Sequence, residues 1–171
     1  EQVYSLNNNS RVSDRSNNLI VLQLTEPIFN DYCNELKMNS EIDFNDMINI
    51  ASKHVYEGKF IHNYKYVIVD EYQDISKSRY NLLKRMRDQK FYKLFCVGDD
   101  WQSIYRFAGS DISFIFDFDK YWGLSEKSKI ETTYRFSSSL IDISGQFVMR
   151  NPKQIKKSLH SLSNENVFSL G

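Results

Sequence analysis

The chain has 171 residues, of which 41% are hydrophobic and 26% charged, and its 22 lysines and arginines balance 22 aspartates and glutamates. This composition predicts a soluble globular protein. Because the net charge is zero, total charge gives no argument for nucleic-acid binding, and any phosphate contact has to come from a local patch.

Cysteine content and hydropathy indicate the compartment in which the protein works. Cys33 and Cys96 are too few and too far apart for a disulfide framework or a metal site, so we expect free thiols in a reducing cytoplasm. No apolar stretch reaches the roughly 18 residues of a membrane span, and the first residues do not form a signal peptide. We therefore expect a cytoplasmic, monomeric protein without a membrane partner. The chain starts with Glu1 rather than methionine and stops abruptly at Gly171, so we also expect an excerpt of a longer protein.

The first 60 residues predict a loop followed by helices. Residues 5–18 are dense in Asn and Ser, which favours an exposed loop or a disordered lead-in. Apolar residues then recur at every fourth position from Ile20 to Leu36, as in a helix, and Pro27 predicts a kink or the start of a new helix. A second helix is predicted after Asp43, which is placed to cap it, and Gly58 is placed to end it. Its apolar face comprises Phe44, Met47, Ile48, Ala51 and Val55.

Two apolar runs in the middle of the chain predict strands that end in acids. Residues 64–74, YKYVIVDEYQD, contain a β-branched run that ends at Asp70 and Glu71 and is typical of a strand buried on both faces. A helical segment follows, with Leu82, Leu83 and Met86 inward and Lys84, Arg85 and Arg87 outward. The next apolar run, KLFCVGDD, ends at Asp99 and Asp100. This order predicts a βαβ unit with a parallel, right-handed crossover. Ligands bind beyond the carboxyl ends of such strands. One Asp-Glu pair could simply open a solvated loop, but two acid-ended strands at one edge favour a site.

The remaining residues predict shorter elements. A short helix and loop are expected over 106–121, and a third strand followed by a serine-capped helix is expected up to Met149. The polar, basic stretch from Asn151 onward predicts a linker. His54, His62 and His160 have no ligand-like spacing and are expected at the surface, as is the basic face of the helix before Lys90.

A buried strand that ends in two carboxylates is suited to a magnesium-nucleotide site. Mg²⁺ keeps most of its waters, so Asp70 alone could position it, while Glu71 could orient the attacking water. Gln102 follows the second pair of acids, where an amide could sense a γ-phosphate. Tyr134 could stack on a base, and Arg135 could neutralise phosphoryl charge.

Three segments in this order, VDEYQD, GDDWQSIYRFAGSD and TTYRF, resemble motifs II, III and IV of the UvrD/Rep-type superfamily 1 DNA helicases. The resemblance covers residues 41–160, and the flanking EIDFNDMI and NPKQIKKSL are most similar to the helicase IV branch. It implies that Asp70 binds Mg²⁺, Glu71 activates water and Gln102 links the γ-phosphate to the DNA groove. It further implies that Arg135 is an arginine finger and that Tyr134 stacks on adenine. Tyr105 and Phe107 would stack on bases of single-stranded DNA, although Phe107 is also compatible with a core position.

The sequence departs from the family pattern in three respects. Ala108 stands where many relatives have arginine, which removes one expected phosphate or DNA contact, although helicase IV-like members tend to have small residues there. No G-x-x-x-x-G-K-[ST] motif is present, since EGKF at 57–60 lacks both the hydroxyl and the upstream glycine. Motifs V and VI are absent as well. We therefore expect the phosphate-binding loop before Glu1, the second motor domain after Gly171, and no ATPase activity in this chain alone.

These observations predict an α/β fold with part of a RecA-like parallel sheet flanked by helices. Residues 1–40 would belong to an inserted helical subdomain, 41–150 to the C-terminal half of the first motor domain, and 151–171 to a linker. The expected function is that of an ATP-dependent helicase with Mg²⁺ and single-stranded DNA as partners. Two alternatives remain open: a metal-dependent nuclease using Asp70, Glu71 and Asp99, and a DNA- or partner-binding module without ATPase activity.

Overall fold

The computed structural model describes residues 12–152 and 154–163, and the chain divides into two compact units, Glu1–Ala51 and Ser52–Gly171. The boundary at residue 40 between an inserted subdomain and a motor domain stays a prediction. The predicted α/β class is confirmed, because helices accompany two short parallel sheets. No helix among the described residues is both long and apolar enough to cross a membrane.

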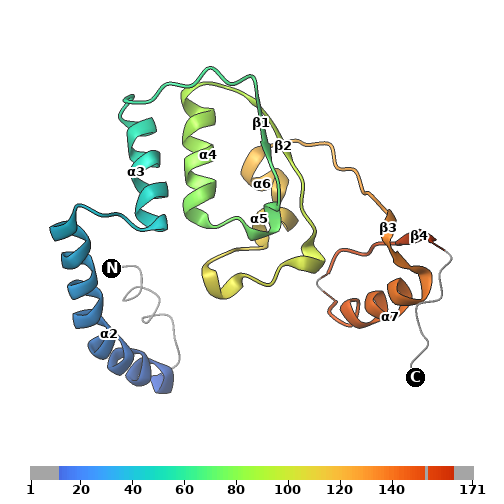
Figure 1. Cartoon of the computed structure of the whole chain (residues 1–171), viewed down its shortest axis with the longest axis horizontal. Helices are drawn as coiled ribbons and strands as arrows, with labels where there is room; N and C mark the ends of the chain where they lie inside the picture. The colour runs from blue at the N-terminus through green and yellow to red at the C-terminus, as the bar shows by residue number, and fades with distance from the viewer. Residues whose placement is uncertain (1–11, 153, 164–171) are drawn as a thin grey trace. The chain divides into compact units, whose positions relative to one another are not determined.

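The first unit consists of α2 (Val12–Asn39) and the beginning of α3 (Phe44–Tyr56), drawn in blue and cyan in Figure 1. The prediction of a loop over 5–18 was wrong for 12–18, which are helical, and residues 5–11 lie outside the described part. Asn and Ser are weak helix formers rather than helix breakers, so an exposed helix tolerates them. The helix also continues through Pro27 instead of restarting there.

The ends of α3 follow the predicted signals. An Asp43 side-chain oxygen, Oδ1, accepts a hydrogen bond from the backbone N–H of Asp46 at 2.7 Å, which confirms the predicted cap. Beyond the helix, Gly58 has φ +69°, a left-handed conformation that favours glycine. Of the predicted apolar face, Val55 is buried, whereas Phe44 is 85% exposed.

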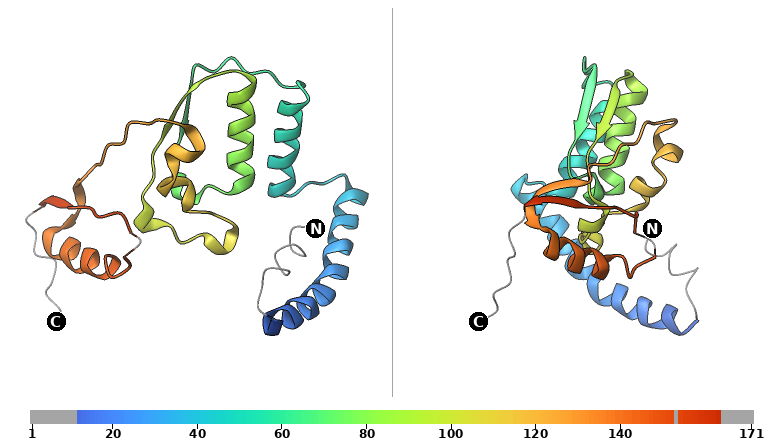
Figure 2. Two further views of the ribbon diagram at one scale, coloured as in Figure 1. Left: turned by 180° about the vertical axis from the view of Figure 1, so that it is seen from behind. Right: turned by 90° about the vertical axis from the view of Figure 1, so that its right-hand side faces the viewer.

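The centre of the second unit is a βαβ unit formed by β1 (Tyr66–Val69), α4 (Lys77–Gln89) and β2 (Lys93–Cys96). The strands pair in parallel, with Tyr66 opposite Lys93 and Val69 opposite Cys96. Figure 2 shows the two strands side by side. The prediction of strands buried on both faces was wrong, because Ile68 is 71% exposed and Phe95 61% exposed. Only the face that bears Val69 and Cys96 packs against the core.

The core beneath this face is aromatic. Tyr72, Ile75 and Phe114 form its buried cluster, supported by the short helices α5 (Ser113–Phe116) and α6 (Phe118–Trp122). The indole N–H of Trp122 donates to the hydroxyl of Tyr72 at 2.6 Å. Desolvation by burial raises the pKa of the Tyr72 hydroxyl.

Two residues near α4 depart from the surface predictions, Arg87 and His62. The rest of the predicted basic face is not contradicted, since Arg85 and Lys90 are exposed. Arg87 donates to the carbonyl of Trp122 at 3.1 Å and lies 5.6 Å from the centroid of its ring, so it packs on the protein instead of facing solvent. Arg85 lies over the ring of Tyr56. His62 is 2% exposed, and its Nε2 lies 2.7 Å from the carbonyl oxygen of Met86. The guanidinium groups contact aromatic faces, so they add to the packing while keeping their charge.

The C-terminal part comprises β3 (Thr132–Ser137), α7 (Ser138–Val148) and β4 (His160–Ser163). Ser137 occupies the N-cap position of α7 as predicted, although its hydroxyl lies 3.2 Å from that of Ser139 and caps no backbone group. Part of the stretch expected to be a linker is a strand, because β4 pairs in parallel with β3.

Candidate functional site

The carboxyl ends of β1 and β2 are joined by backbone hydrogen bonds. Val97 N–H donates to the carbonyl of Val69 at 2.9 Å, and Tyr72 N–H donates to the carbonyl of Val97 at 2.8 Å. The chain passes so close at Gly98 that an added Cβ would lie 2.9 Å from Gln73 Oε1. The predicted acids after the two strands are therefore held at one edge of the sheet, as the βαβ reasoning anticipated.

Asp70 and Glu71 form a tight turn directly after β1. Asp70 Oδ1 accepts a hydrogen bond from the backbone N–H of Glu71 at 2.9 Å, and both residues are exposed. Glu71 has φ 50° and ψ 43°, a left-handed conformation that costs a non-glycine residue about 1 kcal/mol or more. Strain of this kind is concentrated at functional sites, where the surrounding structure enforces it.

Gln73 connects the two acidic strand ends and was missed by the sequence reasoning. Its side chain is 2% exposed, with Nε2 donating to Glu71 Oε2 at 2.7 Å. Its Oε1 accepts from the backbone N–H of Asp99 at 3.0 Å. The only available signal was its place between the acids in DEYQD, and that place does not distinguish a buried bridge from a solvated glutamine.

Asp99 is the branch point of the site. Its Oδ2 accepts from Gln102 Nε2 at 2.7 Å, and its Oδ1 accepts from the backbone N–H of Trp101 at 3.1 Å. The residues Glu71, Gln73, Asp99 and Gln102 thus form a continuous hydrogen-bonded series, which we call the acid-amide series. Two predicted residues, Glu71 and Gln102, lie at its two ends.

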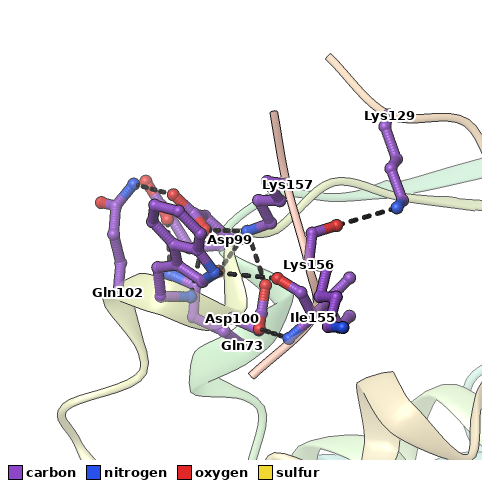
Figure 3. A network of polar contacts seen from close by, with 10 residues as sticks. Gln73, Asp99, Asp100, Gln102, Lys129, Ile155, Lys156 and Lys157 are labelled. Atoms are coloured by element: carbon purple, nitrogen blue, oxygen red, sulfur yellow. Dashed lines mark hydrogen bonds and ion pairs between the residues drawn. The ribbon is translucent and has the colours of Figure 1, made fainter. Parts of the chain in front are cut away.

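Two residues from beyond α7, Ile155 and Lys157, contact the same strand end (Figure 3). The ammonium group of Lys157 pairs with Asp99 Oδ1 and lies 2.5 Å from Oδ1 of Asp100, which is buried. Ile155 donates its backbone N–H to Asp100 Oδ2 at 2.8 Å and accepts from the indole N–H of Trp101 at 3.0 Å. Burial alone would raise the pKa of Asp99, but the bonds from Lys157 and Gln102 outweigh it and hold this pKa below its usual value.

Tyr105 and Phe107 lie on either side of Arg106 around a short 3-10 helix, Arg106–Ala108. Their side chains are 47% and 86% exposed, and their ring centroids are 6.0 Å apart. The alternative that Phe107 is a core ring was therefore wrong. The chain turns away after them at Gly109, which has φ +87°.

Tyr134 and Arg135 lie on β3 and are both exposed, Tyr134 by 77%. The backbone N–H of Arg135 donates to Thr133 Oγ1 at 3.3 Å. Within the described ranges, no hydrogen bond or ion pair joins either side chain to the acid-amide series. Their predicted roles toward a nucleotide remain predictions.

A cavity of about 250 Å³ lies beside the end of β1. It is lined by Val69, Asp70, Glu71, Asp74, Ile75, Arg79, Leu82 and Leu83. Arg79 donates to the carbonyl of Asp74 at 3.2 Å. Both predicted catalytic carboxylates therefore border an open volume next to an arginine.

Comparison with known proteins gives a consistent result. Residues 3–122 match the family model described as the UvrD/REP helicase N-terminal domain. The chain is 40% identical over 144 residues to DNA helicase IV of Escherichia coli strain K12, covering 84% of this chain and 21% of that protein. It is 30% identical over 154 residues to the ATP-dependent DNA helicase PcrA of Bacillus subtilis strain 168, covering 85% of this chain and 20% of that protein. The chain thus spans about a fifth of the length of these curated relatives.

Proposed function

The chain belongs to the UvrD/REP helicase family, and we propose that it forms part of an ATP-dependent helicase that couples MgATP hydrolysis to movement along single-stranded DNA. The acid-amide series at the carboxyl ends of two parallel strands is the observation that supports this proposal most directly. Residues 41–150 would be the C-terminal half of a RecA-like motor domain. The preceding helices would come from an inserted subdomain, and residues 151–171 would lead toward a second motor domain.

Asp70 is suited to hold a hydrated Mg²⁺. One of its oxygens accepts the N–H of Glu71, and the other has no hydrogen-bond partner within residues 12–152 and 154–163. A single exposed carboxylate fits an ion that retains most of its waters and takes its other ligands from phosphate. When bound there, the ion would neutralise charge on the phosphate oxygens.

Glu71 is suited to act as the general base. Gln73 fixes one carboxylate oxygen at 2.7 Å, which orients the group and leaves the other oxygen to take a proton from the attacking water. The left-handed backbone of Glu71 aims this side chain differently from a residue that continues the strand. Orientation of this kind accounts for a large part of phosphoryl-transfer catalysis.

Gln102 and the residues of β3 would contact the nucleotide from other directions. The amide nitrogen of Gln102 is bonded to Asp99, so its carbonyl oxygen points away from the series, as Figure 3 shows. We propose that it senses the γ-phosphate, that Tyr134 stacks on adenine and that Arg135 neutralises phosphoryl charge. The exposure of Tyr134 and Arg135 is compatible with these roles.

Tyr105 and Phe107 are proposed to stack on bases of single-stranded DNA. Two exposed rings three and five residues beyond Gln102 present apolar faces that any base can cover. They follow the acid-amide series directly in the chain. A shift of Gln102 as the γ-phosphate leaves could therefore move the rings.

Replacement of the proposed base tests the function in the intact helicase that contains this chain. Glu71→Gln keeps the shape of the side chain, so ATP should still bind while DNA-stimulated turnover falls by at least about 10². Glu126→Gln, a change at an exposed glutamate elsewhere in the same unit, is the matched control and should retain parental turnover. Unchanged turnover in Glu71→Gln would contradict the assignment of the base.

Two measurements on the intact protein, DNA cleavage without ATP and ATP turnover, distinguish the alternatives. A nuclease would cleave DNA with Mg²⁺ or Mn²⁺ in the absence of ATP, but its third acid, Asp99, is already occupied by Lys157, Gln102 and Trp101. A binding module would bind DNA and show no ATP turnover in the intact parent protein.

A further inference from the structure

Lys157 contacts both acids that follow β2, although 58 and 57 positions separate it from them in the sequence. Its side chain is only 16% exposed, and the Asp100 side chain is 1% exposed. The ammonium group also lies 5.2 Å from the centroid of the Trp101 ring. A lysine on a solvated linker would have none of these contacts.

Asp99 connects Lys157 to Gln102, the predicted γ-phosphate sensor, because it bonds both side chains. Asp99 binds Lys157 through Oδ1 and Gln102 through Oδ2, so the two partners hold opposite oxygens of one carboxylate (Figure 3). A rotation of this carboxylate would move Gln102. It would also disturb Trp101, whose N–H shares Oδ1 with Lys157.

We propose that Lys157 is a positioning residue for ATP hydrolysis, which orients the Gln102 carboxamide by holding Asp99 in place. This inference rests on the proposed function and adds to it a residue outside the three motifs. It also implies that the chain beyond α7 is energetically coupled to the nucleotide site. Lys157 lies two residues after Ile155, whose backbone bonds both Asp100 and Trp101.

The charge of Lys157 is the physical basis of the proposal. Without it, two adjacent carboxylates, one of them buried, would face each other with no cation between them. Like charges repel, and Asp100 would keep its bond from the Ile155 N–H but lose its counter-ion, so the partly exposed Asp99 carboxylate is the one expected to turn away. The expected consequence is a rotation of Asp99 and loss of the fixed orientation of Gln102. A misplacement of about 1 Å at a catalytic group lowers turnover by up to about 10².

The test compares three variants of the intact helicase in a DNA-stimulated ATPase assay. Lys157→Gln should lower kcat by about 10-fold to 100-fold while the Kd of a fluorescent ATP analogue changes less than about twofold. Lys156→Gln removes a positive charge from the adjacent, exposed side chain and should retain parental kcat. Lys157→Arg keeps a cation between the two acids and should retain at least about half of parental kcat.

A double-mutant cycle distinguishes positioning from a general structural role. If Lys157 acts through Gln102, adding Lys157→Gln to Gln102→Ala should change kcat by less than about twofold. Equal losses in both backgrounds would overturn the proposal, as would a Lys157→Gln variant with the kcat of the Lys156→Gln control.

Folding is checked by thermal unfolding of each variant. Should Lys157→Gln fail to fold, Lys157→Arg still decides, since a folded arginine variant with less than about a tenth of parental kcat would refute the ion-pair mechanism. A parent protein without DNA-stimulated turnover would instead refute the proposed function itself.

Discussion

Gly98 should tolerate no side chain, because two backbone segments meet there at the edge of the candidate site. A Cβ at this position would lie 2.9 Å from Gln73 Oε1 and 3.1 Å from the backbone nitrogens of Gln73 and Tyr72. The Tyr72 nitrogen is held by its hydrogen bond to the carbonyl of Val97 at 2.8 Å. The turn therefore cannot move away without breaking the contact between the two strand ends.

The cost of Gly98→Ala follows from these contacts. Forcing a methyl group into a packed site costs about 1–3 kcal/mol. If Gln73 moves to make room, the hydrogen bond from the Asp99 N–H to its Oε1 is lost, which adds about 1 kcal/mol. We expect the free energy of unfolding to fall by about 2–4 kcal/mol in total.

Urea unfolding of this chain measures the effect, with tryptophan fluorescence as the probe, because Trp101 and Trp122 both belong to the unit 52–171. With an m value of about 2 kcal/mol/M, the midpoint should fall by about 1–2 M. Gly145→Ala is the matched control. Gly145 lies inside α7, and a Cβ there would meet only the Trp101 side chain, at 3.8 Å. That change should be neutral or stabilising by up to about 1 kcal/mol. A Gly98→Ala midpoint equal to that of the parent would refute the reasoning.

Three further predictions concern activity, DNA binding and reactivity. This chain by itself should hydrolyse no ATP above background, with or without DNA, since its sequence contains no G-x-x-x-x-G-K-[ST] motif; measurable turnover of the purified chain would contradict this. In the intact helicase, Tyr105→Ala should weaken single-stranded DNA binding by about 1–3 kcal/mol in fluorescence anisotropy and blunt DNA stimulation of the ATPase, with nucleotide affinity unchanged; normal affinity and stimulation would end the stacking hypothesis. Burial raises the pKa of the Cys96 thiol to about 12, so a Cys33→Ser variant should react with a thiol reagent at pH 8 only after unfolding, and fast labelling of the folded chain would show that Cys96 is accessible.

Local features of the fold were predictable because they depend on neighbouring residues. The Asp43 cap and the left-handed Gly58 follow from the backbone chemistry of a few positions. The parallel βαβ unit follows from two apolar runs that are separated by a helical period. The acids after each strand were likewise predicted to share an edge, because connection rules place consecutive parallel strands with their carboxyl ends together.

The packing environment of individual side chains was decided only in three dimensions. Ile68 looked buried on sequence pattern, yet it is exposed because α4 and the aromatic core cover only one face of the β1–β2 pair. Arg87 and His62 looked solvated, yet one packs on Trp122 and the other is buried beside Met86. Hydrophobic pattern indicates which residues can be buried, whereas the positions of other elements determine which of them are.

The same distinction applies to the candidate site. Asp70, Glu71 and Gln102 could be named from the sequence, because each stands in a short recognisable motif, VDEYQD or GDDWQSIYRFAGSD. Gln73 and Lys157 could not, since a glutamine within a turn and a lysine after a helix have the same local pattern whether they are solvated or paired. Their partners lie 26 and 58 positions away, so only the tertiary fold, by bringing residue 157 to the end of β2, decides that these side chains join the site.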